Sequence, residues 1–143
     1  MKLEELQREA KQDLNITDQE SLNQESYKNQ NIKAKWLGYR TKYDQLLIIA
    51  KADHQRLYRQ KWEYYGGKAD AKVYAAKPFD LKVLKTDLQI YINSDEDILN
   101  IQGKISYYES IIKYIDGVTK SIDNRGWDIR NAIDWKKFEA GMV

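Results

Sequence analysis

The stretch DILNIQGKISYYESIIKYIDGVTKSID, residues 97–123, carries the strongest pattern in the sequence. Its apolar residues recur at alternating steps of three and four, the heptad spacing of a helix that packs along another helix. The positions on this seam are Ile98, Ile101, Ile105, Tyr108, Ile112, Ile115, Thr119 and Ile122. The stripe is widened by Leu99, Ile111, Tyr114 and Val118. A helix with so broad an apolar face must be buried against something.

A second long helix is predicted upstream, from about Ser21 to Tyr65, a range without Pro and with Gly38 as its only Gly. An apolar or aromatic residue recurs there every seven positions, at Trp36, Tyr43, Ala50, Leu57 and Tyr64, with companions at Tyr39 and Leu46. The companion seam weakens further along, where Asp53 and Gln60 occupy it. Gly66-Gly67 then supplies the helix stop.

Shorter elements are predicted around these two helices. Residues 3–14 have helical apolar spacing, residues 15–21 read as a break, and residues 68–78 read as a basic loop. Pro78 is well placed to begin a short helix through about Tyr91. Alternation over residues 88–92 also fits a strand, so residues 86–93 stay open between helix and strand.

The C-terminal part is predicted to hold two helices. Ser94-Asp-Glu-Asp97 is a capping-box signature that begins the first, and Arg125-Gly126 ends it. A last short helix covers residues 127–140. The fold class is therefore all-α, with long helices in a bundle that packs like a coiled coil.

Composition restricts the classes of function. The 143 residues are 42% hydrophobic and 32% charged, enough for one domain with a real core and solvated helices. The sequence has no Cys, no apolar run of eighteen residues and no signal-peptide stretch at its start, which fits a reducing cytoplasm. Net charge is −3 over residues 1–32, +8 over 33–85 and −3 over 86–143. The basic middle fits a polyanion, and equally a solvated lysine-rich helix.

Few residues are suited to catalysis. His54 is the only His, and without Cys or a second His it cannot form a zinc site of the usual kind. The acidic run at residues 95–97 is explained by the dipole at a helix start. Gly66-Gly67-Lys68 lacks the upstream Gly and the Ser or Thr of a phosphate-binding loop. We therefore expect a protein that is not an enzyme and has no metal or cofactor.

The segment of residues 56–65 interleaves cationic and aromatic residues, the combination with which single-strand-binding proteins hold phosphates and stack bases. The candidate DNA-binding residues are Arg56, Tyr58, Arg59, Lys61, Trp62 and Lys68. On a helical wheel they do not share one face, because Lys61 lies about 200° from Arg59 at 100° per residue. A solvated helix face remains the alternative interpretation.

Six motifs in order carry a family resemblance: Met1-Lys-Leu-Glu-Glu-Leu-Gln7, Lys35-Trp-Leu37, Arg59-Gln-Lys-Trp-Glu-Tyr-Tyr-Gly-Gly67, Asp95-Glu-Asp-Ile-Leu99, Ser121-Ile-Asp-Asn-Arg-Gly-Trp-Asp-Ile129 and Phe138-Glu-Ala-Gly141. In order, spacing and total length the chain resembles the recombination mediator proteins of T-even-type bacteriophages, the UvsY family. No single motif is specific, whereas the set is.

The resemblance implies a ring-like homo-oligomer, roughly a hexamer to heptamer, that binds single-stranded DNA in the cytoplasm of an infected bacterium. It also implies two protein partners: the phage single-strand-binding protein, which is destabilised on DNA, and the phage RecA-like recombinase, whose filament is helped to assemble. The family's two DNA-binding cations fall on Arg59 and Lys61, with their types exchanged. Trp62 stands where the family has Leu.

The apolar face of the helix at residues 97–123 exceeds what the weaker seam of the other long helix can cover. Uncovered apolar surface usually indicates a partner, and Ile at both seam positions favours assemblies larger than dimers. The predicted oligomerisation residues are Ile105, Tyr108, Ile112, Ile115, Ile122, Trp135 and Phe138. The alternative is an intramolecular bundle that the first and last helices close.

We accordingly divide the chain, as one mediator domain, into three segments: residues 1–67 with the basic DNA-binding helix, 68–93 as a basic loop and short helix, and 94–143 for oligomerisation. The alternative function is a structural coiled-coil scaffold or chaperone without specific DNA binding.

Overall fold

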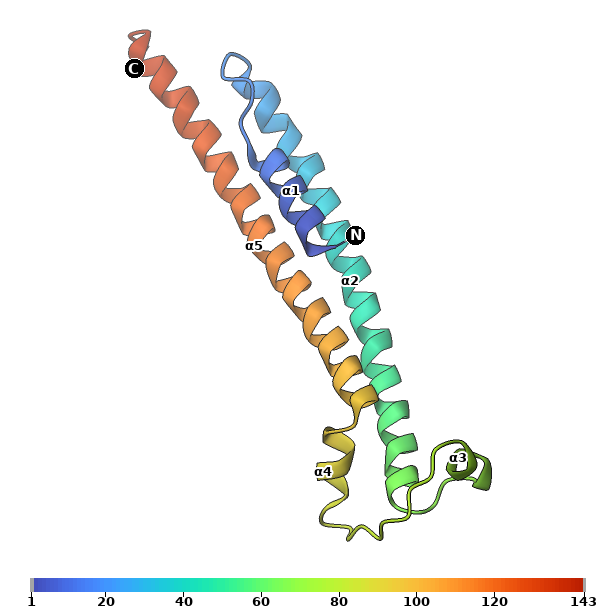
Figure 1. Ribbon diagram of the computed structural model, residues 1–143. Coiled ribbons are helices and arrows are strands. Elements are labelled where there is room, and N and C mark those ends of the chain that lie inside the picture. The colour runs from blue at the N-terminus through green and yellow to red at the C-terminus, as the bar shows by residue number, and fades with distance from the viewer. Residues whose placement is uncertain (1, 143) are drawn as a thin grey trace. The chain divides into compact units, whose positions relative to one another are not determined.

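The computed structural model describes residues 2–142, and its regular elements are all helices (Figure 1). They are α1 (Leu3–Leu14), α2 (Leu22–Tyr65), α3 (Ala71–Ala76), α4 (Leu88–Asn93) and α5 (Glu96–Glu139). Residues 2–142 contain no strand, so the predicted all-α class is confirmed and the open segment at residues 86–93 is resolved as helix α4. The described chain forms two compact units, residues 2–43 with 110–142 and residues 44–109, and α2 and α5 contribute to both.

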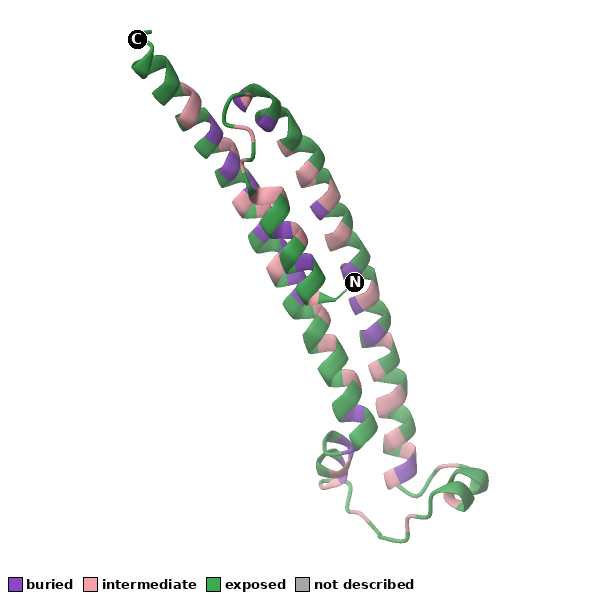
Figure 2. Ribbon diagram, turned by 45° about the horizontal axis from the view of Figure 1, so that its top comes forward, coloured by how far each residue is buried: buried purple, intermediate pink, exposed green. Residues whose placement is uncertain are grey.

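In the first unit, α1, α2 and α5 bury apolar side chains (Figure 2). The buried set is Leu6, Ala10, Leu22, Trp36, Tyr43, Ile111, Ile112, Ile115, Val118, Ile122 and Ile129. Each fully buried Leu or Ile contributes about 1.5–3 kcal/mol to the driving force for folding. The apolar face of α5 in this unit is therefore largely covered within one protomer.

Polar side chains fasten α1 to α2 beside this core. The indole Nε1 of Trp36 donates to Asp13 at 2.9 Å, and the hydroxyl of Tyr39 donates to Glu9 at 2.8 Å. Lys35 pairs with both carboxylates, at 2.8 Å to Glu9 and 2.6 Å to Asp13. Burial lowers the pKa of Lys35, but its hydrogen bonds to the two carboxylates outweigh burial and raise the pKa above its ordinary value.

The predicted seam of α5 is buried in this unit at Ile112, Ile115 and Ile122, whereas the seam position Thr119 is half-buried. Ile111 and Val118, predicted to widen the stripe, are buried as well. A straight α-helix has 3.6 residues per turn, so a strict seven-residue repeat drifts around its surface. Arg125 follows Val118 by seven residues on this buried face and is only 3% exposed.

The predicted helix end at Arg125-Gly126 is wrong, because α5 continues to Glu139 and includes the predicted separate helix at residues 127–140. Gly126 is explained by close packing instead of a helix stop. A Cβ there would come within 3.2 Å of the Asn29 side-chain nitrogen, closer than most real contacts allow. Arg125 is held by buried polar groups, so the helix is fastened at the point where the sequence suggested a break.

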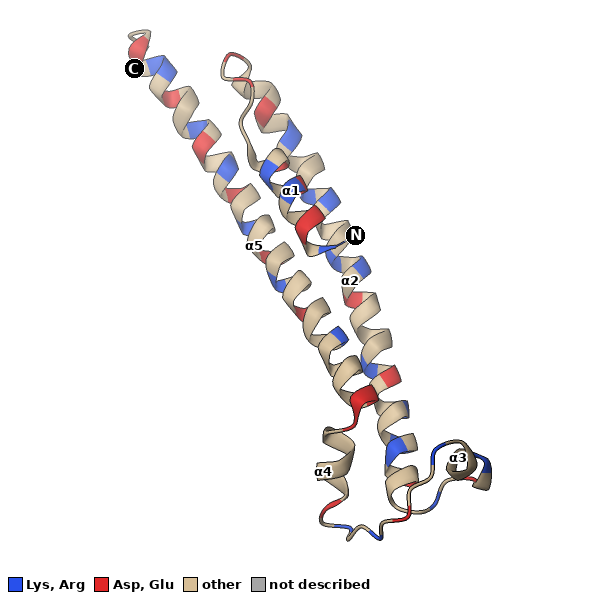
Figure 3. Cartoon of the chain, in the orientation of Figure 1, with Lys and Arg blue, Asp and Glu red and all other residues tan. Residues whose placement is uncertain are grey.

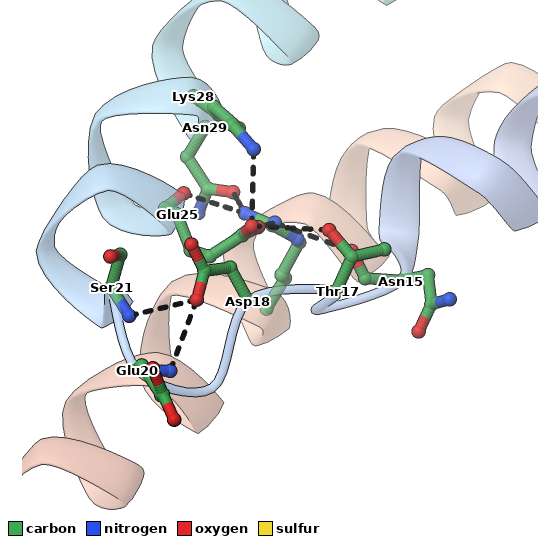
Figure 4. A network of polar contacts seen from close by, with 9 residues as sticks. Asn15, Thr17, Asp18, Glu20, Ser21, Glu25, Lys28 and Asn29 are labelled. Atoms are coloured by element: carbon green, nitrogen blue, oxygen red, sulfur yellow. Dashed lines mark hydrogen bonds and ion pairs between the residues drawn. The ribbon is translucent and has the colours of Figure 1, made fainter.

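A buried ion pair between Arg125 and Glu25 joins α5 to the first turns of α2. The Glu25 carboxylate is the centre of a network of polar contacts (Figure 4). Arg125 also donates to the carbonyl oxygen of Glu25 at 2.9 Å and to Asn29 at 2.5 Å. Thr17 donates to Glu25 at 3.3 Å, and Lys28 pairs with it at 3.1 Å. Burial raises the pKa of Glu25, but Lys28 and Arg125 outweigh it and hold that pKa below its ordinary value.

The core of the second unit is a smaller cluster around α4. Leu88, Ile92 and Ile98 are buried there. Four partly buried residues pack against them: Leu57, Tyr58, Tyr65 and Val83. Because α4 presents one apolar face to α2 and α5, the segment that alternates like a strand folds as a short helix.

The turn after α2 forms as its glycines predict. Gly67 has φ +74°, and Lys68 N–H closes the end of the helix on the Glu63 carbonyl oxygen at 2.8 Å. The predicted loop at residues 68–78 contains α3, whose Tyr74 hydroxyl donates to the Tyr64 carbonyl oxygen at 2.7 Å. Pro78 does not begin a helix, which corrects the prediction: residues 78–84 have no regular structure and α4 begins at Leu88.

Asp95, rather than Ser94, caps the N-terminus of α5. Its carboxylate accepts the backbone N–H of Asp97 at 2.9 Å, whereas the Ser94 hydroxyl bonds back to the Ile90 carbonyl oxygen at 2.7 Å. The capping signature therefore located the helix start correctly within a residue but assigned the cap to the wrong side chain.

Candidate nucleic-acid interface

Arg56 and Arg59 extend into solvent from the last turns of α2. Their side chains are 73% and 82% exposed. Each pairs with one carboxylate on its own helix, Arg56 with Asp53 at 3.2 Å and Arg59 with Glu63 at 3.3 Å. Exposed pairs of this kind contribute only about 0.3–0.5 kcal/mol, so a phosphate can replace the carboxylate at little cost. Both guanidinium groups are available to a polyanion.

Lys61 differs sharply from its neighbours, because its side chain is only 14% exposed and is held by two carboxylates. Its ammonium lies 2.7 Å from Asp97 and 3.3 Å from Asp95. Burial lowers the pKa of Lys61, but the hydrogen bond to Asp97 and the charges of both carboxylates outweigh it and raise that pKa. The Lys61 ammonium therefore keeps its positive charge, and the carboxylates of Asp95 and Asp97 already compensate that charge inside the protein.

Asp95 is the fixed partner in this contact, with a side chain 3% exposed. It accepts the Tyr65 hydroxyl at 2.6 Å as well as the Asp97 N–H. Burial raises the pKa of Asp95, but these hydrogen bonds and the Lys61 charge outweigh it and lower that pKa. Burial, reinforced by the hydrogen bond to this carboxylate, raises the pKa of the Tyr65 hydroxyl. Lys61 therefore belongs to a structural network that joins α2 to the start of α5.

The two candidate aromatic residues lie in different surroundings. Trp62 is 41% exposed, and the Lys68 ammonium lies 4.7 Å from the centre of its ring. Tyr58 is half-buried and packs against the cluster around α4. The structure thus brings Trp62 and Lys68 together as one exposed cation–aromatic pair and leaves Tyr58 as part of the core.

A groove of ≈ 500 Å³ lies beside this pair, within the second unit. Three lysines line it, Lys61, Lys68 and Lys77, and so do three carboxylates, Glu63, Asp70 and Asp97. Figure 3 shows Lys and Arg on the last turns of α2 and around α3, with acidic residues among them. Sequence reasoning missed Asp97 as the partner of Lys61, because only folding brings the end of α2 beside the start of α5.

Residues 2–142 contain no group of three or more His, Cys, Asp or Glu side chains placed to hold a metal ion. None of the described helices is both long and apolar enough to cross a membrane. His54 is half-buried on α2, with its ring centre 6.2 Å from that of Tyr58.

The predicted oligomerisation residues fall into two groups. Ile112, Ile115 and Ile122 are buried in the first unit, and Ile105 and Tyr108 are half-buried. In contrast, Trp135 and Phe138 are 61% and 64% exposed, with ring centres 5.6 Å apart. Of the predicted set, these two aromatic residues are therefore the most exposed to a partner.

The chain is similar to known proteins both in sequence and in fold. Residues 9–142 match the family described as the recombination, repair and ssDNA binding protein UvsY. The recombination protein uvsY of enterobacteria phage T4 is 26% identical over 141 residues, 99% of each chain. The crystal structure of the bacteriophage T4 recombination mediator protein UvsY in lattice type II superposes with a TM-score of 0.85 and 26% identity, over 98% of each chain. Lattice type I gives a TM-score of 0.84 at 24% identity, covering 94% of this chain and 98% of that one. The full-length match in sequence and fold shows that this chain belongs to the UvsY family of recombination mediator proteins.

Proposed function

We propose that this protein binds single-stranded DNA and promotes loading of the phage RecA-like recombinase onto DNA covered by single-strand-binding protein. Homologous recombination, repair and recombination-dependent replication would use this activity, in the cytoplasm of the infected bacterial host. The family description supports the DNA-binding part, and the T4 relative is named a recombination protein. The two protein partners follow from the family resemblance.

The observation that carries the proposal is an exposed cationic and aromatic surface on one turn of helix and the adjoining loop. Arg59 is 82% exposed, and Trp62 with Lys68 forms a second contact point next to the groove. Single-strand binders combine cations along the backbone with aromatic faces for bases, each stack contributing roughly 1–3 kcal/mol. Arg56 extends the cationic surface by one turn toward the N-terminus of α2.

The DNA-binding surface of one protomer is small, so stable binding of a strand requires several copies of that surface in one assembly. A homo-oligomeric ring presents the site many times, and avidity then multiplies a weak contact without any new interaction. We propose that Trp135 and Phe138 on the C-terminal segment, residues 94–143, contribute to the contact between subunits, because both are exposed. Residues 1–67 and 68–93 then supply the DNA-binding helix and basic loop. Binding alone performs this function, without catalysis, metal or cofactor.

The experiment is fluorescence anisotropy with labelled oligo-dT at two salt concentrations. Counterion release predicts a steep fall in affinity with salt, with a slope of about −0.7 per neutralised phosphate for single strands. Lack of binding at the lower salt would favour the alternative, a scaffold whose arginines form only the solvated i,i+3 and i,i+4 pairs seen here. Mass photometry with and without the oligonucleotide gives the subunit number in the same sample.

A further inference from the structure

A second groove, of ≈ 570 Å³, lies in the first unit between the early turns of α2 and the later turns of α5. Its walls carry Ser26, Gln30 and Lys33 from α2 and Trp127 and Arg130 from α5. Small-molecule sites typically occupy 300–1,000 Å³, so the space suits a single nucleotide or a short peptide.

Trp127 is the aromatic residue of this groove and is 60% exposed, so burial in the core does not account for it. The Arg130 guanidinium carbon lies 4.7 Å from the centre of its ring, so the indole and guanidinium form one exposed cation–aromatic unit. The arrangement repeats that of Trp62 with Lys68, at the same 4.7 Å separation of cation and ring centre. Bases stack on aromatic rings and on guanidinium planes alike.

The opposite wall is polar and firmly held. Asn29 uses its amide twice, donating to the Ile122 carbonyl oxygen at 3.3 Å and accepting from Arg125. Lys33 is paired with Asp123 at 2.9 Å, with 36% of its side chain exposed. Since Asp123 compensates Lys33, the net charge offered to a ligand comes from Arg130. The buried pair of Arg125 and Glu25 fixes this wall relative to α5 before any ligand arrives.

We propose that this groove holds one nucleotide of single-stranded DNA, with the base stacked on Trp127 and the backbone phosphate bound by Arg130. The inference rests on the proposed function and adds a second contact point on each protomer. A nucleotide fits better than an apolar peptide segment, because the reachable wall presents hydroxyl, amide and ammonium groups of Ser26, Gln30 and Lys33. Stacking on Trp127 tolerates any base, as a protein that organises DNA of arbitrary sequence requires.

The test compares Trp127→Ala with Tyr27→Ala as a matched control. Tyr27 is an aromatic residue of the same unit with 75% exposure, but it does not line the groove. Oligo-dT affinity is measured by anisotropy over a range of salt, and oligomer mass by mass photometry. Trp127→Ala is expected to weaken binding roughly 5- to 150-fold with an unchanged salt slope, which corresponds to the removal of one base stack. Arg130→Gln is expected to flatten the slope by about 0.7, because one phosphate is no longer neutralised.

The outcomes are distinguishable. If the wild-type protein binds oligo-dT and Trp127→Ala binds it with the same affinity, the groove is overturned as a DNA site and the proposed function stays intact. Loss of affinity in Trp127→Ala together with a lower oligomer mass assigns the surface to a protein interface and also overturns the groove. If wild-type protein fails to bind oligo-dT at all, the proposed function fails first, and this inference falls with it.

Discussion

Replacing Arg59 and Lys61 separately by Ala distinguishes a DNA contact from a structural one. The Arg59 side chain is 82% exposed and has one i,i+4 partner, so Arg59→Ala should cost less than about 0.5 kcal/mol of stability. The same variant should flatten the salt slope by about 0.7 for each phosphate that Arg59 neutralises. Weaker binding with almost unchanged stability is the signature of an exposed DNA-binding side chain.

Lys61→Ala should behave in the opposite way. Its removal leaves Asp95, with a side chain 3% exposed, without its nearby cation, although the Tyr65 hydroxyl and the Asp97 N–H remain. Leaving a buried polar group short of a partner costs about 1–3 kcal/mol. At about 4 °C per kcal/mol for a chain of this size, the melting temperature should fall measurably. The effect on DNA affinity should be smaller than that of Arg59→Ala.

The assay pairs thermal unfolding, followed by circular dichroism, with oligo-dT anisotropy at several salt concentrations for both variants. Lys61→Met serves as a control, because it keeps an aliphatic stem and removes the ammonium with its charge and hydrogen bonds. The reasoning is refuted if Arg59→Ala binds with wild-type affinity and slope while Lys61→Ala binds more weakly at unchanged stability. That result would mean that DNA displaces Asp97 and Asp95 from Lys61.

Three further predictions follow from the burial or exposure of particular side chains. Glu25→Gln should destabilise the protein by about 3 kcal/mol at pH 7, because it removes one member of a buried ion pair. The folded pKa of Glu25 is lowered, so its stabilisation is present above the ordinary value of 4.5 and is lost as pH falls through the folded value. The gap between wild type and variant in urea titrations should shrink below that pH, and a constant gap would contradict the assignment. Trp62→Phe should reduce Trp quenching by poly-dT, whereas Tyr58→Ala should lower stability more than affinity; full quenching in the first variant would return Trp62 to a packing role. Ala at both Trp135 and Phe138 should lower the oligomer mass at fixed concentration without loss of helical signal, and an unchanged mass by sedimentation would exclude these residues from the interface.

The helices themselves were predictable because their determinants are local. Apolar spacing defined α1 and most of α2 and α5, Gly66-Gly67 ended α2, and the acidic run at residues 95–97 marked the start of α5. The family motifs, taken in order, were also enough to identify the family, which the full-length comparison confirms. Local pattern failed where a short element depends on packing, as at α3 and after Pro78.

Tertiary structure decided which side chains are free to act. Arg125 with Gly126 was predicted to end a helix, yet Arg125 lies on the buried face seven residues beyond Val118 and pairs with Glu25, 100 residues away in the sequence. The family resemblance gives Arg59 and Lys61 the same DNA-binding role, whereas folding exposes one and surrounds the other with carboxylates from the start of α5. Local pattern specifies helical faces because neighbouring residues determine the hydrogen-bonded backbone. Whether a charge on such a face meets solvent or a buried partner depends on residues distant in the chain, and only the packed helices bring those residues together.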